Sequence, residues 1–378
     1  MSDVNPCFSE DIWFEILKNL PVKTLGKCRC VCKSWHSLIV SPSFMSAHFK
    51  HYTQNIANSV IFYKKSSGSR YCKPFVQFCD SALLGENCSL HTSNYPVLVC
   101  DYMRRCFQLI GSVYGLLCLF DDIYIRPYIF ILIWNPVLQQ CIKLPITTFM
   151  DRTSTLGFGY DCRKNDHRVV RICFSANEAP VVEVFSVQEQ TRRIISADYL
   201  VNNSITNISS TNCFVNGVIH WFIWDSKNWP FRAKTLLMFD VSDEKFEMME
   251  LPGNITNMGE TRNCKNFGIF EYQGMLSLSL YDPDISSRCQ IWVQREYNDA
   301  SSWYKILDVT SLHNFSLTVP VQYLGKNGEL LGSTIRYRDD ELMYYDTRTA
   351  DIKDLGFHTN YWTSFSAYSE SLVFLDQN

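Results

Sequence analysis

Residues 8–52 read FSEDIWFEILKNLPVKTLGKCRCVCKSWHSLIVSPSFMSAHFKHY, and this stretch is helical in pattern where the rest of the chain is not. Its apolar positions Ile12, Trp13, Ile16, Leu17 and Leu20 follow the i, i+1, i+4, i+5, i+8 spacing of one helix face. The stretch therefore predicts a small helical module at the start of the chain.

Capping and proline signals divide this module into short helices. Ser9 is placed to cap the first helix, and Pro21 closes it because the residue before a proline is pushed out of helical geometry. A second helix is predicted through Cys28 and Trp35, and Pro42 begins a third, since proline suits the first helical position. Three or four such helices bury little by themselves, and domains of this size usually need a partner, a metal or a disulfide. We therefore expect apolar side chains of the module to face another protein.

The order of motifs in this module resembles the F-box of plant F-box proteins. The resemblance rests on the runs LPVKTL at 20–25, CVCKSW at 30–35 and SPSF at 41–44, although Phe8-Ser9 stands where the family usually has Leu-Pro. In that family the F-box docks onto a Skp-type adaptor carried by a cullin, and the rest of the chain captures a substrate for ubiquitin transfer. We expect ten residues to be buried between the helices and the adaptor: Ile12, Ile16, Leu17, Leu20, Pro21, Leu25, Val31, Cys32, Trp35 and Leu38.

Composition narrows the classes of function for the whole chain. Its 378 residues carry 35 basic and 38 acidic side chains, a net charge of −3, which gives no electrostatic footprint for nucleic acid. The start of the chain lacks the pattern of a signal peptide, and no apolar run reaches the roughly 20 residues needed to span a bilayer. We expect a soluble protein of the cytoplasm or nucleus, with its 16 cysteines reduced.

A β unit recurs in the remainder of the chain. Each copy has a turn, an apolar strand, a second strand ending in Asp or Asn, a polar turn and a short third strand. The dipeptides Asn216-Gly217 and Asn327-Gly328 lie between apolar runs and predict two-residue hairpins, because that turn needs positive φ at both positions. The copies lie at 114–145, 214–252, 272–306 and 324–355, with a degenerate member at 156–186.

Such units predict a mainly β fold behind the helical module. A sheet of this kind cannot bury both faces alone, and radial packing of several gives a β-propeller. A repeat of roughly 40 to 55 residues predicts six or seven blades, and a large β-sandwich is the alternative. We divide the chain into the helical module at 1–52, a linker with irregular first strands at 53–108, and the repeat β domain at 109–378.

The β region carries a second resemblance. The runs WNP at 134–136, GFGYD at 157–161 and VVRI at 169–172 are similar to the F-box-associated, kelch-like propeller domain of plant F-box proteins. The S-locus F-box proteins of pollen are one branch with this layout.

The sequence contains no complete motif for metal binding, dinucleotide binding or serine-hydrolase catalysis. Cys28, Cys30 and Cys32 form a C-x-C-x-C run, but a closed zinc site wants wider spacing and a second pair of ligands, so helix packing is the preferred interpretation. Gly157-x-Gly159 lacks the third glycine of a dinucleotide fingerprint, and the chain has no G-x-S-x-G elbow. We predict no catalytic residue, no metal and no cofactor.

The predicted function is that of a substrate-recognition subunit of a Skp–cullin–F-box ubiquitin ligase, acting by proximity and without chemistry of its own. Its expected partners are the Skp-type adaptor, a cullin through it, and a protein substrate, with neither nucleic acid nor membrane. Trp224 and Trp229 flank a polar loop and are the candidate substrate-binding residues, since loops on a rigid scaffold often bind. The alternatives are a propeller interaction module that works without the ligase and a propeller enzyme.

Overall fold

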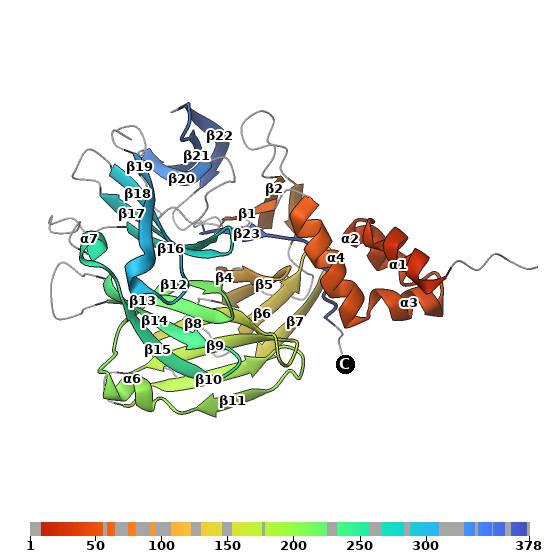
Figure 1. Ribbon diagram of the computed structural model, residues 1–378, viewed down its shortest axis with the longest axis horizontal. Coiled ribbons are helices and arrows are strands. Elements are labelled where there is room, and N and C mark those ends of the chain that lie inside the picture. Colours follow the sequence, from red (N-terminus) through yellow and green to blue (C-terminus); the bar gives the residue numbers. More distant parts are fainter. Residues whose placement is uncertain are drawn as a thin grey trace, which may run out of the picture.

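The computed structural model joins a helical module to a ring of β-sheets (Figure 1). It describes residues 9–55, 59–64, 75–80, 91–94, 107–121, 130–145, 153–175, 178–224, 233–256, 266–282, 288–309, 329–336, 339–349, 351–359 and 364–375.

The module has four helices, which agrees with the predicted three or four. They are α1 (Glu10–Lys18), α2 (Val22–Cys28), α3 (Lys33–Ile39) and α4 (Pro42–Asn55). As predicted, α4 begins at Pro42, and the Ser41 hydroxyl accepts a hydrogen bond from the Phe44 N–H over 3.3 Å. The prediction of one helix through Cys28 and Trp35 is wrong, because this stretch is divided between α2 and α3.

Cys32 is the reason for the break. It has extended backbone geometry, with φ −157° and ψ 163°, and its Sγ accepts a hydrogen bond from the Trp35 N–H over 3.5 Å, so it caps α3. Cys28 and Cys32 consequently do not share one helix face. Among the described residues, no group of three or more His, Cys, Asp or Glu side chains is placed to hold a metal.

The strands form six antiparallel sheets within the described part of the chain, which follow one another around a centre (Figure 1). This arrangement is a propeller and not the two facing layers of a sandwich. The first sheet has the strand order β23 (Ser364–Tyr368), β1 (Ser59–Lys64), β2 (Phe75–Asp80), β3 (His91–Asn94). The second sheet has the strand order β4 (Phe107–Val113), β5 (Leu116–Asp121), β6 (Phe130–Asn135), β7 (Gln140–Pro145).

The remaining sheets have the same plan. The third and fourth are β8 (Thr153–Asp161), β9 (Asp166–Phe174), β10 (Val181–Ser186), β11 (Arg192–Ile195), and β12 (Ile208–Val215), β13 (Val218–Trp224), β14 (Ala233–Asp240), β15 (Lys245–Glu250). The fifth and sixth are β16 (Asn266–Tyr272), β17 (Met275–Asp282), β18 (Arg288–Gln294), β19 (Trp303–Val309), and the three-stranded β20 (Glu329–Arg336), β21 (Asp339–Asp346), β22 (Ile352–Thr359). Short helices α6 (Asp198–Asn202), α7 (Gly253–Thr256) and η3 (Ala300–Ser302) lie in connections.

Strands from both ends of the β region close the ring. β23 pairs antiparallel with β1, with Val60 opposite Ala367. The range 53–108, predicted as a linker with irregular strands, supplies β1, β2 and β3 to this sheet. A closed ring leaves no long exposed sheet edge between its first and last blades.

Strand β8 packs closely against β12 and β13 of the next sheet. A Cβ on Gly157 would clash with the Trp221 ring and with Ile219, and a Cβ on Gly159 would clash with Val241 and Phe214. The Trp221 indole N–H donates a 3.0 Å hydrogen bond to the Leu156 carbonyl. The GFG run of β8 is therefore a packing requirement: only glycine lets the buried tryptophan reach the neighbouring backbone.

The hairpin between β12 and β13 has the predicted turn. Asn216 and Gly217 both have positive φ, at 52° and 82°. Tyr114-Gly115 and Gln273-Gly274 repeat this geometry in two other sheets. The other predicted turn, Asn327-Gly328, lies outside the described residues.

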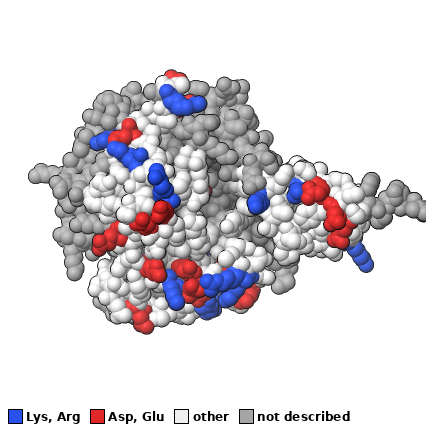
Figure 2. All heavy atoms as spheres, viewed as in Figure 1, with Lys and Arg blue, Asp and Glu red and all other residues white. Residues whose placement is uncertain are grey.

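Charged side chains of both signs alternate on the face seen in Figure 2, without a broad field of one sign. The Arg288 guanidinium and the Asp308 carboxylate, for example, lie 2.6 Å apart. In the described helices, no segment has the length and apolar character needed to cross a bilayer.

Candidate protein-binding surfaces

The helical module exposes large apolar side chains that a folded domain normally buries. Ile12 and Ile16, one turn apart on α1, are 44% and 45% exposed, and Val31 in the α2–α3 connection is 65% exposed. These are three of the seven large apolar side chains exposed among the described residues. We call Ile12, Ile16 and Val31 together the apolar surface of the module. Ile12 and Ile16 are neighbours on one face of α1, and exposed apolar side chains that lie together mark protein-binding sites.

The predicted adaptor-binding residues divide into an outer and an inner set. Pro21 and Cys32 are exposed like the apolar surface, and Leu20 and Trp35 are half-buried. The inner set consists of Leu17, Leu25 and Leu38, which are buried in one core with Val22, Ile39 and Phe44. The inner set holds the helices together and presents no side chain to a partner in this structure.

Two contacts fix the helices beneath the apolar surface. The Trp13 and Trp35 rings meet edge to face at 4.9 Å and join α1 to α3. Nε2 of buried His48 on α4 donates a 2.9 Å hydrogen bond to the Leu20 carbonyl. Burial holds the pKa of His48 below its usual value, so the ring is neutral and suited to this bond.

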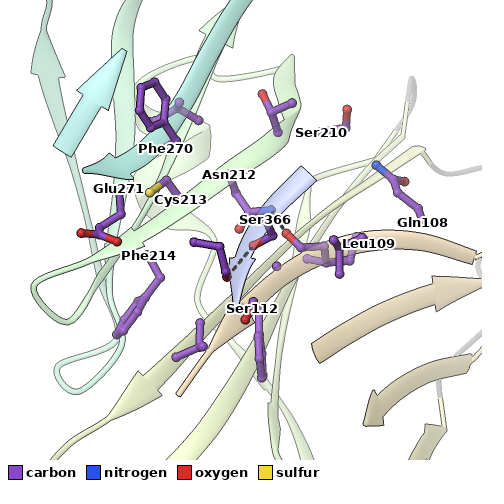
Figure 3. Close-up of a pocket in the computed structure, with 17 residues that line it drawn as sticks. Gln108, Leu109, Ser112, Ser210, Asn212, Cys213, Phe214, Phe270, Glu271 and Ser366 are labelled. Carbon is purple, nitrogen blue, oxygen red and sulfur yellow. Dashed lines mark hydrogen bonds between the residues drawn. The ribbon is translucent and has the colours of Figure 1, made fainter. Parts of the chain in front are cut away.

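A second candidate site is a cavity of about 160 Å³ at the centre of the propeller. Figure 3 shows side chains from β4, β12, β16 and β23 around it. Its lining mixes apolar side chains with uncharged polar ones such as Ser112, Ser366 and Asn212. Glu271 is the single charged residue among those that line it. β4 and β12 are both bulged here, and the Asn212 amide spans the two strands with a 2.9 Å bond to the Ile110 carbonyl.

Aromatic side chains gather at the end of the propeller nearest α4. Tyr114, 45% exposed, contacts Tyr160 at 4.9 Å between ring centroids, Phe214 at 6.5 Å and Phe49 of α4 at 5.4 Å. Burial raises the pKa of Tyr114 and Tyr160, so both hydroxyls are neutral near pH 7. The cluster combines contact area with hydroxyl groups, as protein-binding sites often do.

A cleft of about 570 Å³ lies between the helical module and the propeller. Arg29, His36 and Met45 line it on the helical side, and residues of the β8–β9 and β10–β11 connections line it opposite. Phe374 contributes to its floor, with the Arg29 guanidinium 3.5 Å from the centre of the Phe374 ring.

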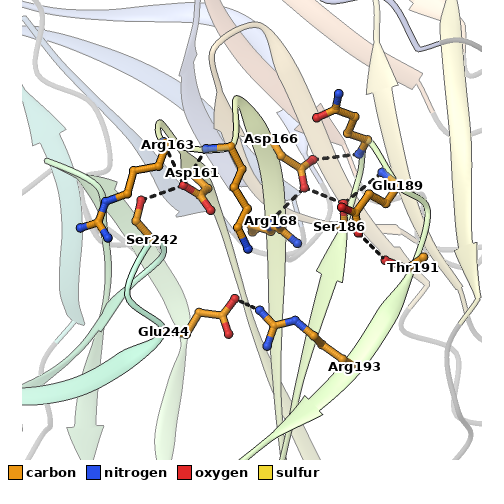
Figure 4. A network of polar contacts seen from close by, with 12 residues as sticks. Asp161, Arg163, Asp166, Arg168, Ser186, Glu189, Thr191, Arg193, Ser242 and Glu244 are labelled. Carbon is orange, nitrogen blue, oxygen red and sulfur yellow. Dashed lines mark hydrogen bonds and ion pairs between the residues drawn. The ribbon is translucent and has the colours of Figure 1, made fainter.

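Buried charged side chains in the β8–β11 sheet are paired with one another and stabilise the sheet. Figure 4 shows the Asp166 carboxylate beside the Ser186 hydroxyl, which donates a hydrogen bond of 2.5 Å to it. The same carboxylate accepts a 2.8 Å hydrogen bond from the Gln188 N–H. Arg168 lies 3.1 Å from the same carboxylate. Buried ion pairs of this kind need several partners to offset their desolvation, and these bonds keep the sheet's turns together.

Comparison with known proteins decides the family. Residues 6–46 match the F-box domain, and residues 60–378 match the family described as F-box associated beta propeller domain. The chain is an F-box protein with an F-box-associated β-propeller.

Relatives of this F-box protein share most of its length. An F-box/kelch-repeat protein of Arabidopsis thaliana is 25% identical over 313 residues, which is 80% of this chain and 79% of the relative. An Arabidopsis F-box protein is 23% identical over 400 residues, covering 92% of this chain and 87% of the relative. The likeness to the S-locus branch stays a prediction.

Two solved structures are distantly similar to this F-box protein. TolB from Acinetobacter baumannii has a TM-score of 0.49 at 8% identity, over 86% of this chain and 73% of TolB. The β-propeller domain of the Trilobed protease from Pyrococcus furiosus has a TM-score of 0.38 at 9% identity, over 79% and 80% of the two chains. Neither likeness bears on function.

The predicted substrate-binding residues of this F-box protein have different outcomes. Trp224 is half-buried, and its ring lies 6.0 Å from both Phe222 and Phe267, between two sheets. Trp229 lies outside the described residues, so its role stays a prediction. The cluster around Tyr114 was not predicted, because its members come from three sheets and from α4. The one local sign of this cluster in the sequence is an aromatic residue one position before the end of β8 and of β12, at Tyr160 and Phe214.

Proposed function

We propose that this F-box protein is the substrate-recognition subunit of a Skp–cullin–F-box ubiquitin ligase. The observation that carries the proposal is the apolar surface of the module, presented on a helical core that is packed against a propeller. In this role Ile12, Ile16 and Val31 bury against a Skp-type adaptor, and Pro21 and Cys32 border the contact.

The contribution of this chain to ubiquitin transfer is positional. The propeller binds a protein substrate and holds one of its lysines near the ubiquitin-loaded enzyme, which raises the effective concentration of the reacting groups. No residue of this chain takes part in bond making, and we place the complex in the cytoplasm or nucleus.

A single substitution on the apolar surface tests the proposal. Ile16→Asp places a charge at an exposed position, so the helices keep their core while the adaptor contact loses an apolar anchor. We expect the affinity of the full-length protein for purified Skp-type adaptor to fall at least roughly tenfold, as for a central interface residue. Ile194→Asp is the matched control, since Ile194 is 62% exposed on β11 of the propeller.

If the Ile16→Asp variant binds the adaptor as tightly as the wild type, the apolar surface is not part of the adaptor contact. If the wild-type protein binds no Skp-type adaptor at all, the ligase-independent interaction module becomes the better description.

A further inference from the structure

The C-terminal tail, residues 369–375, follows β23 and is fastened to the β4–β7 sheet. The buried Asn135 amide donates hydrogen bonds to the Ser371 carbonyl at 3.1 Å and the Val373 carbonyl at 2.9 Å. The Gln140 side-chain oxygen accepts a 3.0 Å bond from the Leu375 N–H. Main-chain groups of the tail are thereby held by side chains of β6 and β7.

The same tail enters the core of the F-box. Leu372 is 2% exposed and belongs to one apolar cluster with Leu17, Val22, Leu25 and Phe44 of the helices. Leu375, three residues further on, is 5% exposed and packs instead into the core of the propeller. Neighbouring leucines of one tail thus complete two different cores.

Polar and aromatic contacts reinforce the junction. The Tyr52 hydroxyl of α4 donates a 3.0 Å hydrogen bond to the Glu370 carboxylate. The Arg29 guanidinium of the α2–α3 connection stacks on Phe374 at 3.5 Å. Tail residues therefore contact both α4 and the α2–α3 connection, and Figure 1 shows the tail running from β23 past α4.

The tail passes close to the backbone of the propeller at Gly115. Gly115 has φ +78°, and a Cβ at this position would clash with the side chain of Ser371 and the carbonyl of Ser369. The glycine of the Tyr114-Gly115 turn consequently has two roles: it adopts the positive φ of the turn between β4 and β5, and it leaves room for Ser369 and Ser371 of the tail. Such close approach of two backbones is a usual reason for glycine at a turn.

We propose that the C-terminal tail is the positioning element of the F-box, with Leu372 completing the helical core, so that adaptor binding depends on the propeller to which the tail is fastened. The dependence on adaptor binding rests on the proposed function, whereas the completion of the core does not. The physical reason is size: four short helices have too little apolar interior to be stable alone, and the tail supplies a missing part.

This arrangement also has a consequence for ubiquitin transfer. A module held at Leu372, Glu370 and Phe374 has a fixed orientation relative to the propeller. Substrate bound to the propeller is then presented at one distance and angle from the adaptor, and this raises the fraction of productive encounters.

Amide hydrogen exchange of the full-length protein, without adaptor, tests the completion of the core. Leu372→Ala leaves a cavity in the F-box, and a buried Leu→Ala change shifts the opening equilibrium by roughly 30-fold or more. We expect exchange in α1, α2 and α4 to accelerate by about that factor. Leu375→Ala is the matched control, and it should accelerate exchange in β4–β7 while leaving the helices near wild type.

Adaptor affinity provides the second measurement. Leu372→Ala should weaken binding at least roughly tenfold, whereas Leu372→Met, which refills the site, should bind close to wild type. If Leu372→Ala does not fold, Leu372→Val removes a smaller volume and takes its place.

Equal exchange of the helices in the Leu372 and Leu375 variants would overturn the proposal. Failure of the wild type to bind adaptor would instead count against the proposed function, because the exchange experiment contains no adaptor.

Discussion

Gly157 shows how one missing side chain fixes the spacing of two sheets. We expect Gly157→Ala to lower the free energy of unfolding by about 1–3 kcal/mol, because its Cβ would overlap the Trp221 ring. The gain in chain stiffness from Gly→Ala, about 0.4–1 kcal/mol, does not offset this overlap. Denaturant titration of the purified variant measures the difference.

Gly111 on β4 is the matched control for this prediction. A Cβ there would meet its nearest neighbour, Phe158, at an ordinary 3.8 Å. Gly111→Ala should therefore leave stability near wild type or raise it slightly. If both variants lose the same stability, the close approach of Trp221 does not explain the GFG run.

At the scale of elements, glycine is required at position 217 of the β12–β13 turn by backbone geometry and not by packing. No atom lies within 4 Å of a Cβ added to Gly217, so the cost of Gly217→Ala comes from its φ of +82°. We expect a loss of about 1–2 kcal/mol, the usual penalty for an L side chain in this region. Gly217→Asn should cost less, because asparagine tolerates positive φ, and thermal melts of both variants separate strain from any loss of packing.

The elements show how far local patterns determine this fold. Strand and turn signals predicted the repeating sheets, and the Asn216-Gly217 turn is confirmed. The break between α2 and α3 was missed because apolar spacing continues from Cys28 to Trp35, while the break depends on a thiol cap at Cys32. Helix caps made by cysteine lack the sequence signal of Ser, Thr, Asp or Asn.

At the scale of the molecule, contacts between distant parts of the chain were beyond sequence analysis. The pairing of β23 with β1 and the position of Leu372 among the helices join segments far apart in sequence. Neither leaves a periodic signal, since the run LVFL at 372–375 does not show which of its apolar side chains packs into which core. The predicted adaptor-binding residues were therefore a mixture of surface and core, because one helix face serves both purposes.

Buried histidines give the whole molecule an expected response to acid. Burial lowers the pKa of His167 and His220 to about 4 from an ordinary 6.5. Between pH 6.5 and pH 4 these histidines are protonated in the unfolded chain but stay neutral in the folded chain. The free energy of unfolding therefore decreases as pH falls from about 6.5 to about 4. Glu370 opposes this trend, since burial raises its pKa and its contribution is lost as pH rises. Burial also lowers the pKa of His48, so three histidines act against Glu370 and the net effect is a loss of stability in acid.

The melting temperature of the wild-type protein at pH 7 and pH 5 measures this response, and we expect the lower value at pH 5. His220→Gln removes one of these histidines, so the difference in melting temperature between pH 7 and pH 5 should shrink. This holds even though the variant loses the contact with the Tyr297 hydroxyl, 3.1 Å from Nε2. His36→Gln, at an exposed position on α3, should keep the wild-type difference. A protein equally stable at both pH values would mean that His167 and His220 can be protonated in the folded state, which their burial at 5% and 0% exposure argues against.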